Sequence, residues 1–241
     1  MPTTTGRSQN ASDSPLEMIA IDLDGTLVDS VGDLHAAVVR MQKTTHRDTA
    51  SIEDVRHWVG NGIERLVHRA MTGSMDEDAS ADIFDVALAA FLTAYDDTNG
   101  TASQLYPGVE SGLEWLTTLK IPLVCVTNKA GRFSRPLVRA LGIDKYFKHH
   151  IAGDDVENKK PHPAALLEAA RLSNARPAHC LVIGDSISDI RAGRAADFSV
   201  VAVTYGYNHG RSVSSLTGSD QPDAAIDSFD ELPKVLSTYK R

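Results

Sequence analysis

Four short runs of apolar residues along the chain each end abruptly at a polar residue. The runs are Met18 to Ile21, Leu123 to Val126, Cys180 to Ile183 and Val200 to Val203, and the residues after them are Asp22, Thr127, Gly184 with Asp185, and Thr204. Four apolar residues in a row, without alternation, predict a strand that is buried on both faces of a parallel sheet. The pattern therefore predicts a buried sheet whose strand ends carry polar side chains.

Segments with helical spacing of apolar residues lie between these runs. Leu113, Leu116 and Leu119 form one such set, and Leu166, Leu167 and Ala170 form another. Strands that alternate with helices predict a doubly wound, Rossmann-like α/β fold with a parallel sheet. Ligands in such folds bind at the carboxyl ends of the strands, so the polar residues after the runs are the candidates for function.

The segment 30–104 differs from the rest, because it has helical spacing and no strand-like run. Its apolar positions are Leu34, Ala37, Val38 and Met41, then Ile63, Leu66, Val67, Ala70 and Met71, and then Ile83, Val86, Ala87, Ala90, Phe91 and Ala94. Such spacing predicts amphipathic helices. We therefore expect a tail at 1–15, an α/β core formed by 16–29 and 105–241, and an all-helical domain inserted at 30–104.

Composition and charge indicate which binding partners and which cellular compartment are expected for this protein. Hydrophobic residues make up 42% of the 241 residues, and the formal net charge of −8 argues against nucleic acid or an anionic membrane, which both require basic patches. Cys125 and Cys180 lie inside apolar runs and are expected to be buried thiols. No apolar stretch approaches the ~20 residues that span a bilayer, and the polar N-terminus lacks the apolar segment of a signal peptide. We expect a cytoplasmic monomer or homodimer with a disordered tail.

The strongest chemical signal is Asp22-Leu23-Asp24-Gly25-Thr26, which directly follows the first run. Two carboxylates two positions apart at a strand end cannot both point into the core. One carboxylate can attack phosphorus while the other transfers a proton. Gly25 permits a tight turn whose backbone amides face an anion. The alternative interpretation is an ordinary acidic turn after a strand.

Two further elements could contact a phosphate group. Thr127 and Asn128 offer a hydroxyl and an amide at a strand end, although both residue types also commonly begin loops. Lys160, in Lys159-Lys160-Pro161, can neutralise phosphate charge and keep a nucleophilic carboxylate ionised. The alternative for this lysine is a solvated basic pair before a helix.

The segment Gly184 to Asp189 supplies acidic oxygens after the third run. Asp185 and Asp189, with the serines between them, suit a hard cation such as Mg²⁺. A helix N-terminus with acidic caps is the alternative, and it explains at most one of the two aspartates.

Together, these four elements resemble the motifs of the haloacid dehalogenase-like hydrolase superfamily, and the resemblance covers nearly all of the chain after the tail. It implies that Asp22 is the nucleophile, that Asp24 is the general acid and base, and that Thr127 and Lys160 are the residues of the second and third motifs. The phosphate group would also contact Gly25, Thr26 and Asn128.

The same resemblance implies Mg²⁺ as the cofactor. Its ligands would be the Asp22 carboxylate, the backbone carbonyl of Asp24 and the Asp185 carboxylate, with Asp189 as a second acidic residue of the fourth motif. The inserted helices would form a cap that closes over the phosphate.

Several segments are similar to those of bacterial phosphoglycolate phosphatases. They are Gly60-Asn61-Gly62, Leu105 to Val109, Val126 to Lys129, Gly153 to Pro163 and Thr204 to Asn208. This similarity implies that the substrate is a small phosphorylated organic acid, 2-phosphoglycolate, which is hydrolysed to glycolate and phosphate. Its carboxylate would meet Gly60, Asn61 and Gly62, which open a helix, with Arg65 as a further partner.

Other functions stay open from the sequence. A pyrophosphatase or a broad small-molecule phosphomonoesterase would use much the same core. A non-catalytic binding module on a hydrolase core is an alternative of another class, and it would be expected to lack the nucleophile, the acid or a metal ligand. The segment Lys129 to Arg135 has no role in any of these interpretations.

Overall fold

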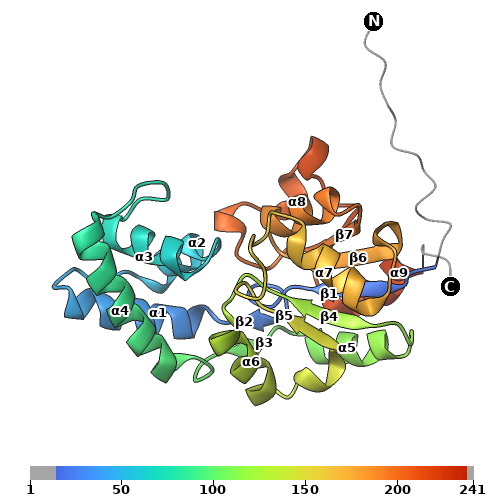
Figure 1. The fold of residues 1–241 in the computed structure, drawn as a ribbon, viewed down its shortest axis with the longest axis horizontal. Helices are drawn as coiled ribbons and strands as arrows, with labels where there is room; N and C mark the ends of the chain where they lie inside the picture. The colour runs from blue at the N-terminus through green and yellow to red at the C-terminus, as the bar shows by residue number, and fades with distance from the viewer. Residues whose placement is uncertain (1–14, 238–241) are drawn as a thin grey trace, which may run out of the picture.

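The computed structural model describes residues 15–237, and its centre is a six-stranded parallel sheet (Figure 1). The strands are β1 (Met18–Ile21), β4 (Leu123–Val126), β5 (His149–Ile151), β6 (Cys180–Gly184), β7 (Ser199–Val203) and β8 (Ala224–Ile226). Their order is β5-β4-β1-β6-β7-β8, and every neighbouring pair is parallel. The predicted doubly wound α/β fold is confirmed.

Helices cover both faces of this sheet, because alternate residues of each apolar strand point to opposite faces. The helices are α5 (Val109–Thr117), α6 (Gly131–Ala140), α7 (Ala164–Ser173), α8 (Ile187–Ala195) and α9 (Leu232–Leu236). Ile19 and Ile21 share one apolar cluster with α5, α6 and α9, whereas Met18 and Ala20 share another with α7 and α8. A strand buried on both sides therefore needs an unbroken apolar run, as the sequence has.

Short 3-10 helices occupy several of the connections. They are η2 (Asp144–Tyr146), η3 (Pro177–His179), η4 (Asn208–Gly210), η5 (Val213–Ser215), η6 (Gly218–Asp220) and η7 (Phe229–Glu231). Of these, η4 lies in the connection after β7, on the side of the molecule that faces the inserted helices.

Four helices form the inserted segment: α1 (Val31–Thr44), α2 (Ile52–Trp58), α3 (Ile63–Thr72) and α4 (Ala81–Thr98). Figure 1 shows them grouped beside the sheet and not on either of its faces. They enclose an apolar cluster of their own, with Met41, Val67 and Phe91 fully or almost fully buried. The spacing of apolar residues predicted α1, α3 and α4 and missed α2, in which only Val55 and Trp58 are buried.

The chain enters and leaves these helices through two paired segments. Strand β2 (Val28–Asp29) pairs antiparallel with β3 (Gln104–Leu105), with Val28 opposite Leu105. Entry and exit therefore lie side by side, which leaves the four helices attached to the sheet through a narrow, two-stranded connection. We call the segment 30–104 the cap below.

Two expectations concern the ends and the surroundings of the chain. The expected disordered tail, 1–15, lies outside the described residues except for Pro15. Within 15–237, no helix combines the length and the apolar character that crossing a membrane would require.

Candidate active site

The sheet order brings the carboxyl ends of three strands together. Because β1 lies between β4 and β6, Asp22 after β1 has Thr127 after β4 on one side and Asp185 after β6 on the other. The backbone N–H of Asp22 donates to the carbonyl of Ile183 at 2.9 Å, which continues the pairing of the strands to this point. The polar residues singled out in the sequence thus meet at one edge.

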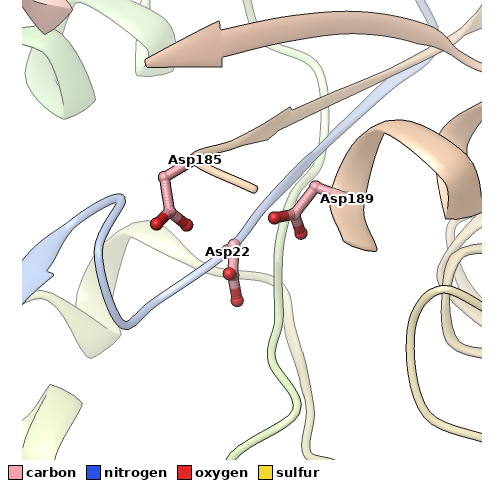
Figure 2. A group of neighbouring side chains, drawn as sticks. All are labelled: Asp22, Asp185 and Asp189. Atoms are coloured by element: carbon pink, nitrogen blue, oxygen red, sulfur yellow. The ribbon is translucent and has the colours of Figure 1, made fainter. Parts of the chain in front are cut away.

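Three carboxylates gather at this edge. Asp22, Asp185 and Asp189 each offer an oxygen, and these oxygens all lie within 4.8 Å of one another. Figure 2 shows the three carboxylates turned toward a common space. All three residues are buried, and Asp189 is only 1% exposed. Three acidic groups at this spacing repel one another and need positive charge nearby.

Lys160 supplies part of that charge. Its Nζ lies 2.8 Å from an oxygen of Asp22 and 2.6 Å from Oδ1 of Asp189, and it donates to the carbonyl of Val126 at 2.9 Å. The side-chain amide of Asn128 donates to the Lys160 carbonyl and accepts from its N–H, both at 2.9 Å. Asn128 lines the cavity described below, but its side chain is engaged in positioning Lys160.

The surroundings shift the pKa of each charged group in the cluster for different reasons. Burial, with the carboxylates of Asp189 and Asp185, raises the pKa of Asp22 well above its usual range, although Lys160 opposes this shift. Burial and Asp189 raise the pKa of Asp185 to about 7. Burial alone would lower the pKa of Lys160, but Asp189 and Asp22 outweigh it and raise that pKa. Lys160 is therefore a permanent cation in the site.

The donor set fits a hard divalent cation. Three carboxylates and one ammonium leave about two negative charges uncompensated when all are ionised. Asp185 receives only the Thr26 hydroxyl at 3.1 Å and the Tyr207 N–H at 2.7 Å, so it has no cationic partner within the described part of the chain. Mg²⁺ prefers carboxylate oxygens of this kind and usually takes few of them.

Asp189 is tied more tightly than the other two carboxylates. Its Oδ1 receives Lys160, and its Oδ2 accepts from the N–H of Ser186 at 3.2 Å and the hydroxyl at 2.7 Å. This is a capping box at the start of α8. Asp189 does not line the cavity. Its contacts suit a residue that holds Lys160 in place.

Gly25 and Thr26 both pack against the carboxylate of Asp185. A Cβ added to Gly25, whose φ is +85°, would lie 2.3 Å from Oδ2 of Asp185. Thr26 is fully buried and donates to Oδ1 of the same carboxylate. Neither residue is among those that line the cavity, and both lie against Asp185, so their expected contact with substrate stays a prediction.

Asp24 has partners that the sequence interpretation missed. Its Oδ1 accepts from the Ser30 hydroxyl at 2.5 Å and from Nζ of Lys129 at 3.1 Å. Lys129 is 7% exposed and also donates to the hydroxyl of Tyr95 in α4. Since Lys129 comes two residues after Thr127 at a strand end, the rule that identified the other site residues would have found it as well.

A cavity of about 100 Å³ lies between the strand ends and the cap. Its core side is formed by Asp22, Asp24, Thr127, Asn128, Lys129, Lys160, Asp185, Ser186 and Ser188, with Tyr207, Asn208 and His209 from the loop after β7. Its cap side is formed by Leu34, Val59, Gly60, Asn61, Gly62, Ile63, Leu66 and Tyr95. The expected cap loop, Gly60 to Gly62, therefore faces the carboxylate cluster.

Arg65 is placed elsewhere. Its guanidinium donates to the carbonyl of Met75 at 2.6 Å and pairs with Asp78, and it does not line the cavity. The expected contact between Arg65 and the substrate therefore stays a prediction, and in the structure this arginine holds the connection between α3 and α4. The local sequence could not show that the following loop folds back over this side chain.

Tyr207 joins the carboxylate cluster to the entry of the cap. Its backbone N–H donates to Asp185, while its hydroxyl accepts from the N–H groups of Ser30 at 2.8 Å and Val31 at 3.1 Å and donates to Asp29 at 2.8 Å. These N–H groups belong to the start of α1, which needs acceptors of this kind. One residue thus contacts both parts of the molecule.

Comparison with known proteins yields matches to one family. The family model of the haloacid dehalogenase-like hydrolases matches residues 16–197. A phosphoglycolate phosphatase of Nitrosococcus oceani is 46% identical over 92% of this chain and 96% of its own length. One from Pseudomonas putida is 42% identical over 87% of this chain and 76% of its own.

Solved structures give the same result. The crystal structure of a predicted phosphoglycolate phosphatase from Haemophilus somnus superposes with a TM-score of 0.84 at 32% identity, covering 91% of this chain and 97% of its own. A predicted phosphatase from Clostridium acetobutylicum, at 19% identity, has a TM-score of 0.78 over 93% of this chain and all of its own, and shares the fold.

Proposed function

Because this chain belongs to the haloacid dehalogenase-like hydrolase family, we propose that it is a Mg²⁺-dependent phosphatase that hydrolyses 2-phosphoglycolate to glycolate and phosphate. The observation that carries the proposal is the cluster of Asp22, Asp185 and Lys160 in the cavity between the strand ends and the cap. The substrate is supported by the relatives named phosphoglycolate phosphatase, which align over most of this chain.

Asp22 is the nucleophile in this proposal. Its carboxylate oxygen attacks phosphorus and forms the phospho-aspartate, and the bond from phosphorus to the glycolate oxygen breaks. Lys160 offsets the charge of the phosphate and of Asp22, and preorganised charge of this kind contributes most of the catalysis in phosphoryl transfer. Burial at a strand end fixes the attacking oxygen with little loss of entropy on binding.

Asp24 carries the proton. It protonates the departing glycolate oxygen, and it then takes a proton from the water that attacks phosphorus and releases phosphate from Asp22. Oδ1 of Asp24 is occupied by Ser30 and Lys129, whereas Oδ2 has no hydrogen-bond partner within residues 15–237. Oδ2 is therefore the oxygen available for proton transfer.

Asp22 and Asp185 would hold the Mg²⁺, with the backbone carbonyl of Asp24 as a further ligand. The ion would supply positive charge to the phosphoryl oxygens and to the attacking carboxylate. Asp189 would act through Lys160, to which its Oδ1 is bound.

The cavity favours a small ester. A volume of about 100 Å³ is below the ~300–1,000 Å³ of sites for drug-sized ligands, which argues against nucleotides. Pyrophosphate is small enough to fit, and it remains the second candidate. We further propose that the enzyme works in the cytoplasm, as a monomer or a homodimer.

The proposal is tested by phosphate release from 2-phosphoglycolate, pyrophosphate, sugar phosphates and nucleotides, each with Mg²⁺ and with excess chelator. We expect a strong preference for 2-phosphoglycolate that is lost with the chelator. Broad or pyrophosphate-selective hydrolysis would retain the chemistry and overturn the substrate. Absence of activity on every ester would favour a binding module.

A further inference from the structure

We propose that His209 binds the carboxylate of the substrate and thereby selects phosphorylated acids over other small phosphate esters. This inference rests on the proposed function and assigns one residue to the part of the substrate that does not react. His209 lies in η4, in the loop after β7, and it lines the cavity where that loop meets Gly60 of the cap.

Charge in the cavity points to this residue. The basic side chains that line it are Lys129, Lys160 and His209. Lys160 is paired with Asp22 and Asp189, and Lys129 is paired with Asp24. His209 has no acidic partner within the described residues. Of these three basic side chains, His209 is therefore the one left to bind a second negative group of a substrate.

The ring of His209 is fixed in orientation. Its Nδ1 lies 3.0 Å from the carbonyl oxygen of His57 in α2, and a carbonyl only accepts, so Nδ1 carries the proton. Nε2 makes no hydrogen bond to any residue between 15 and 237 and is left for a ligand. The ring also lies against the cap loop, since a Cβ added to Gly60 would be 2.8 Å from its Cε1 and 3.1 Å from its Nε2. Glycine at this position lets the imidazole approach the loop.

A buried cation lies behind the same loop. Arg69 of α3 is 6% exposed and makes no ion pair within the described part of the chain. Its guanidinium instead donates to the carbonyls of Trp58 at 2.6 Å and Gly60 at 3.4 Å and to Oδ1 of Asn61 at 3.2 Å. Arg69 thus shapes the loop and gives this end of the cavity a positive potential, opposite in sign to the carboxylate cluster.

Protonation of His209 fits this role. Burial lowers the pKa of His209, and the neighbouring charges of Arg69 and His57 lower it further. A carboxylate that arrives at Nε2 reverses this balance, because an opposite charge within ~4–6 Å favours the imidazolium. The ring is therefore charged when the acid is bound.

Substitution of His209 by asparagine or by glutamine tests the roles of its two ring nitrogens one at a time. In His209→Asn the amide nitrogen takes the place of Nδ1 and nothing replaces Nε2, and asparagine tolerates the positive φ of +51° at this position. In His209→Gln the amide nitrogen reaches the place of Nε2 but carries no charge. His46→Asn is the matched control, because His46 is exposed, also has a positive φ, of +53°, and does not line the cavity.

The measurement is the ratio of kcat/KM for 2-phosphoglycolate to kcat/KM for 2-hydroxyethyl phosphate, which has a neutral hydroxymethyl group in place of the carboxylate. This ratio is independent of the folded fraction of each variant. We expect His209→Asn to lower it about 10- to 100-fold, mainly through KM, as loss of a charged hydrogen bond predicts. His209→Gln should lower it less, and His46→Asn should leave it within twofold.

Each outcome decides between the two proposals. A wild-type preference for 2-phosphoglycolate that survives in His209→Asn overturns the role of His209 alone. A wild-type enzyme that hydrolyses other esters in preference to 2-phosphoglycolate overturns the proposed substrate, and with it the carboxylate that His209 is proposed to bind.

Discussion

The two sides of the cavity are built in different ways. The core side consists of side chains at the ends of adjacent strands, and the ammonium of Lys160 alone contacts Asp22, Asp189 and the carbonyl of Val126. The cap side presents the backbone of Gly60 to Gly62, supported by Arg69 and contacted by His209. The contact between His209 and His57 joins positions 152 residues apart.

This difference suggests that the core side carries out the reaction, whereas the cap side determines which substrate is chosen. The core side depends on short motifs whose members lie at the ends of neighbouring strands, so its geometry is fixed by the sheet. The cap side depends on how a separate group of helices sits against one loop. Changes on the core side should therefore abolish the reaction, whereas changes at the cap or at its attachment should alter stability or choice of substrate.

The largest effect is expected from Asp22→Asn. The amide keeps the shape of the side chain but is a poor nucleophile, so kcat should fall about 10⁴-fold or more. Steady-state hydrolysis of 2-phosphoglycolate measures the loss. Asp97→Asn is the control, because this carboxylate is exposed and, among residues 15–237, pairs only with Arg40. Comparable losses in both variants would contradict the assignment.

Lys160→Met should have the next largest effect. It removes the cation shared by Asp22 and Asp189, and kcat should fall about 10²- to 10³-fold. Without metal, the uncompensated buried carboxylates should also cost about 3–5 kcal/mol of stability. Kinetics and urea unfolding measure the two losses. Lys159→Met is the matched control, since Lys159 is half-exposed and lies 3.7 Å from Glu64; an equal loss there would refute a specific role for Lys160.

Tyr207→Phe tests the connection between the two sides. The N–H groups of Ser30 and Val31 lose their acceptor, and the free energy of unfolding should fall by about 1–3 kcal/mol. The backbone N–H that binds Asp185 is retained, so the affinity for Mg²⁺ should change less than stability does. Urea unfolding and Mg²⁺ titration by calorimetry check this. A loss of metal affinity with unchanged stability would be the contrary result.

The smallest effect is expected from pH on the metal-free protein. Because the pKa of Asp185 is raised to about 7, the folded state binds more protons than the unfolded state, and stability falls as pH rises from about 4 to 7. Bound Mg²⁺ should offset this loss, so the increase in Tm caused by Mg²⁺ should be larger at pH 8 than at pH 5.5. Differential scanning calorimetry measures both shifts, and an increase independent of pH would argue against the coupling.

The sequence predicted the buried parts of the fold better than its edges. The apolar runs identified β1, β4, β6 and β7, which are the four interior strands of the sheet. The edge strands β5 and β8 were missed, because each is three residues long and only one of the three is buried. A strand that is half-buried lacks the continuous apolar run on which the prediction depends.

The candidate site shows the same division. Residues on strand ends could be grouped from sequence, and the structure brings Asp22, Lys160, Asp185 and Asp189 together. The roles of Tyr207 and His209 could not be seen, since their contacts with the cap join segments about 150 residues or more apart. The loop that binds Arg65 could not be seen either, since nothing in the local sequence shows that it folds back over α3.

The phospho-aspartate at position 22 is the central claim, and trapping it tests the claim most directly. Borohydride reduces an acyl phosphate to an alcohol, so protein quenched during turnover of 2-phosphoglycolate should contain homoserine in place of Asp22, detected by peptide mass spectrometry. Protein quenched without substrate should retain aspartate. Homoserine at Asp24 or Asp185, or at no position under conditions of rapid turnover, would contradict the account.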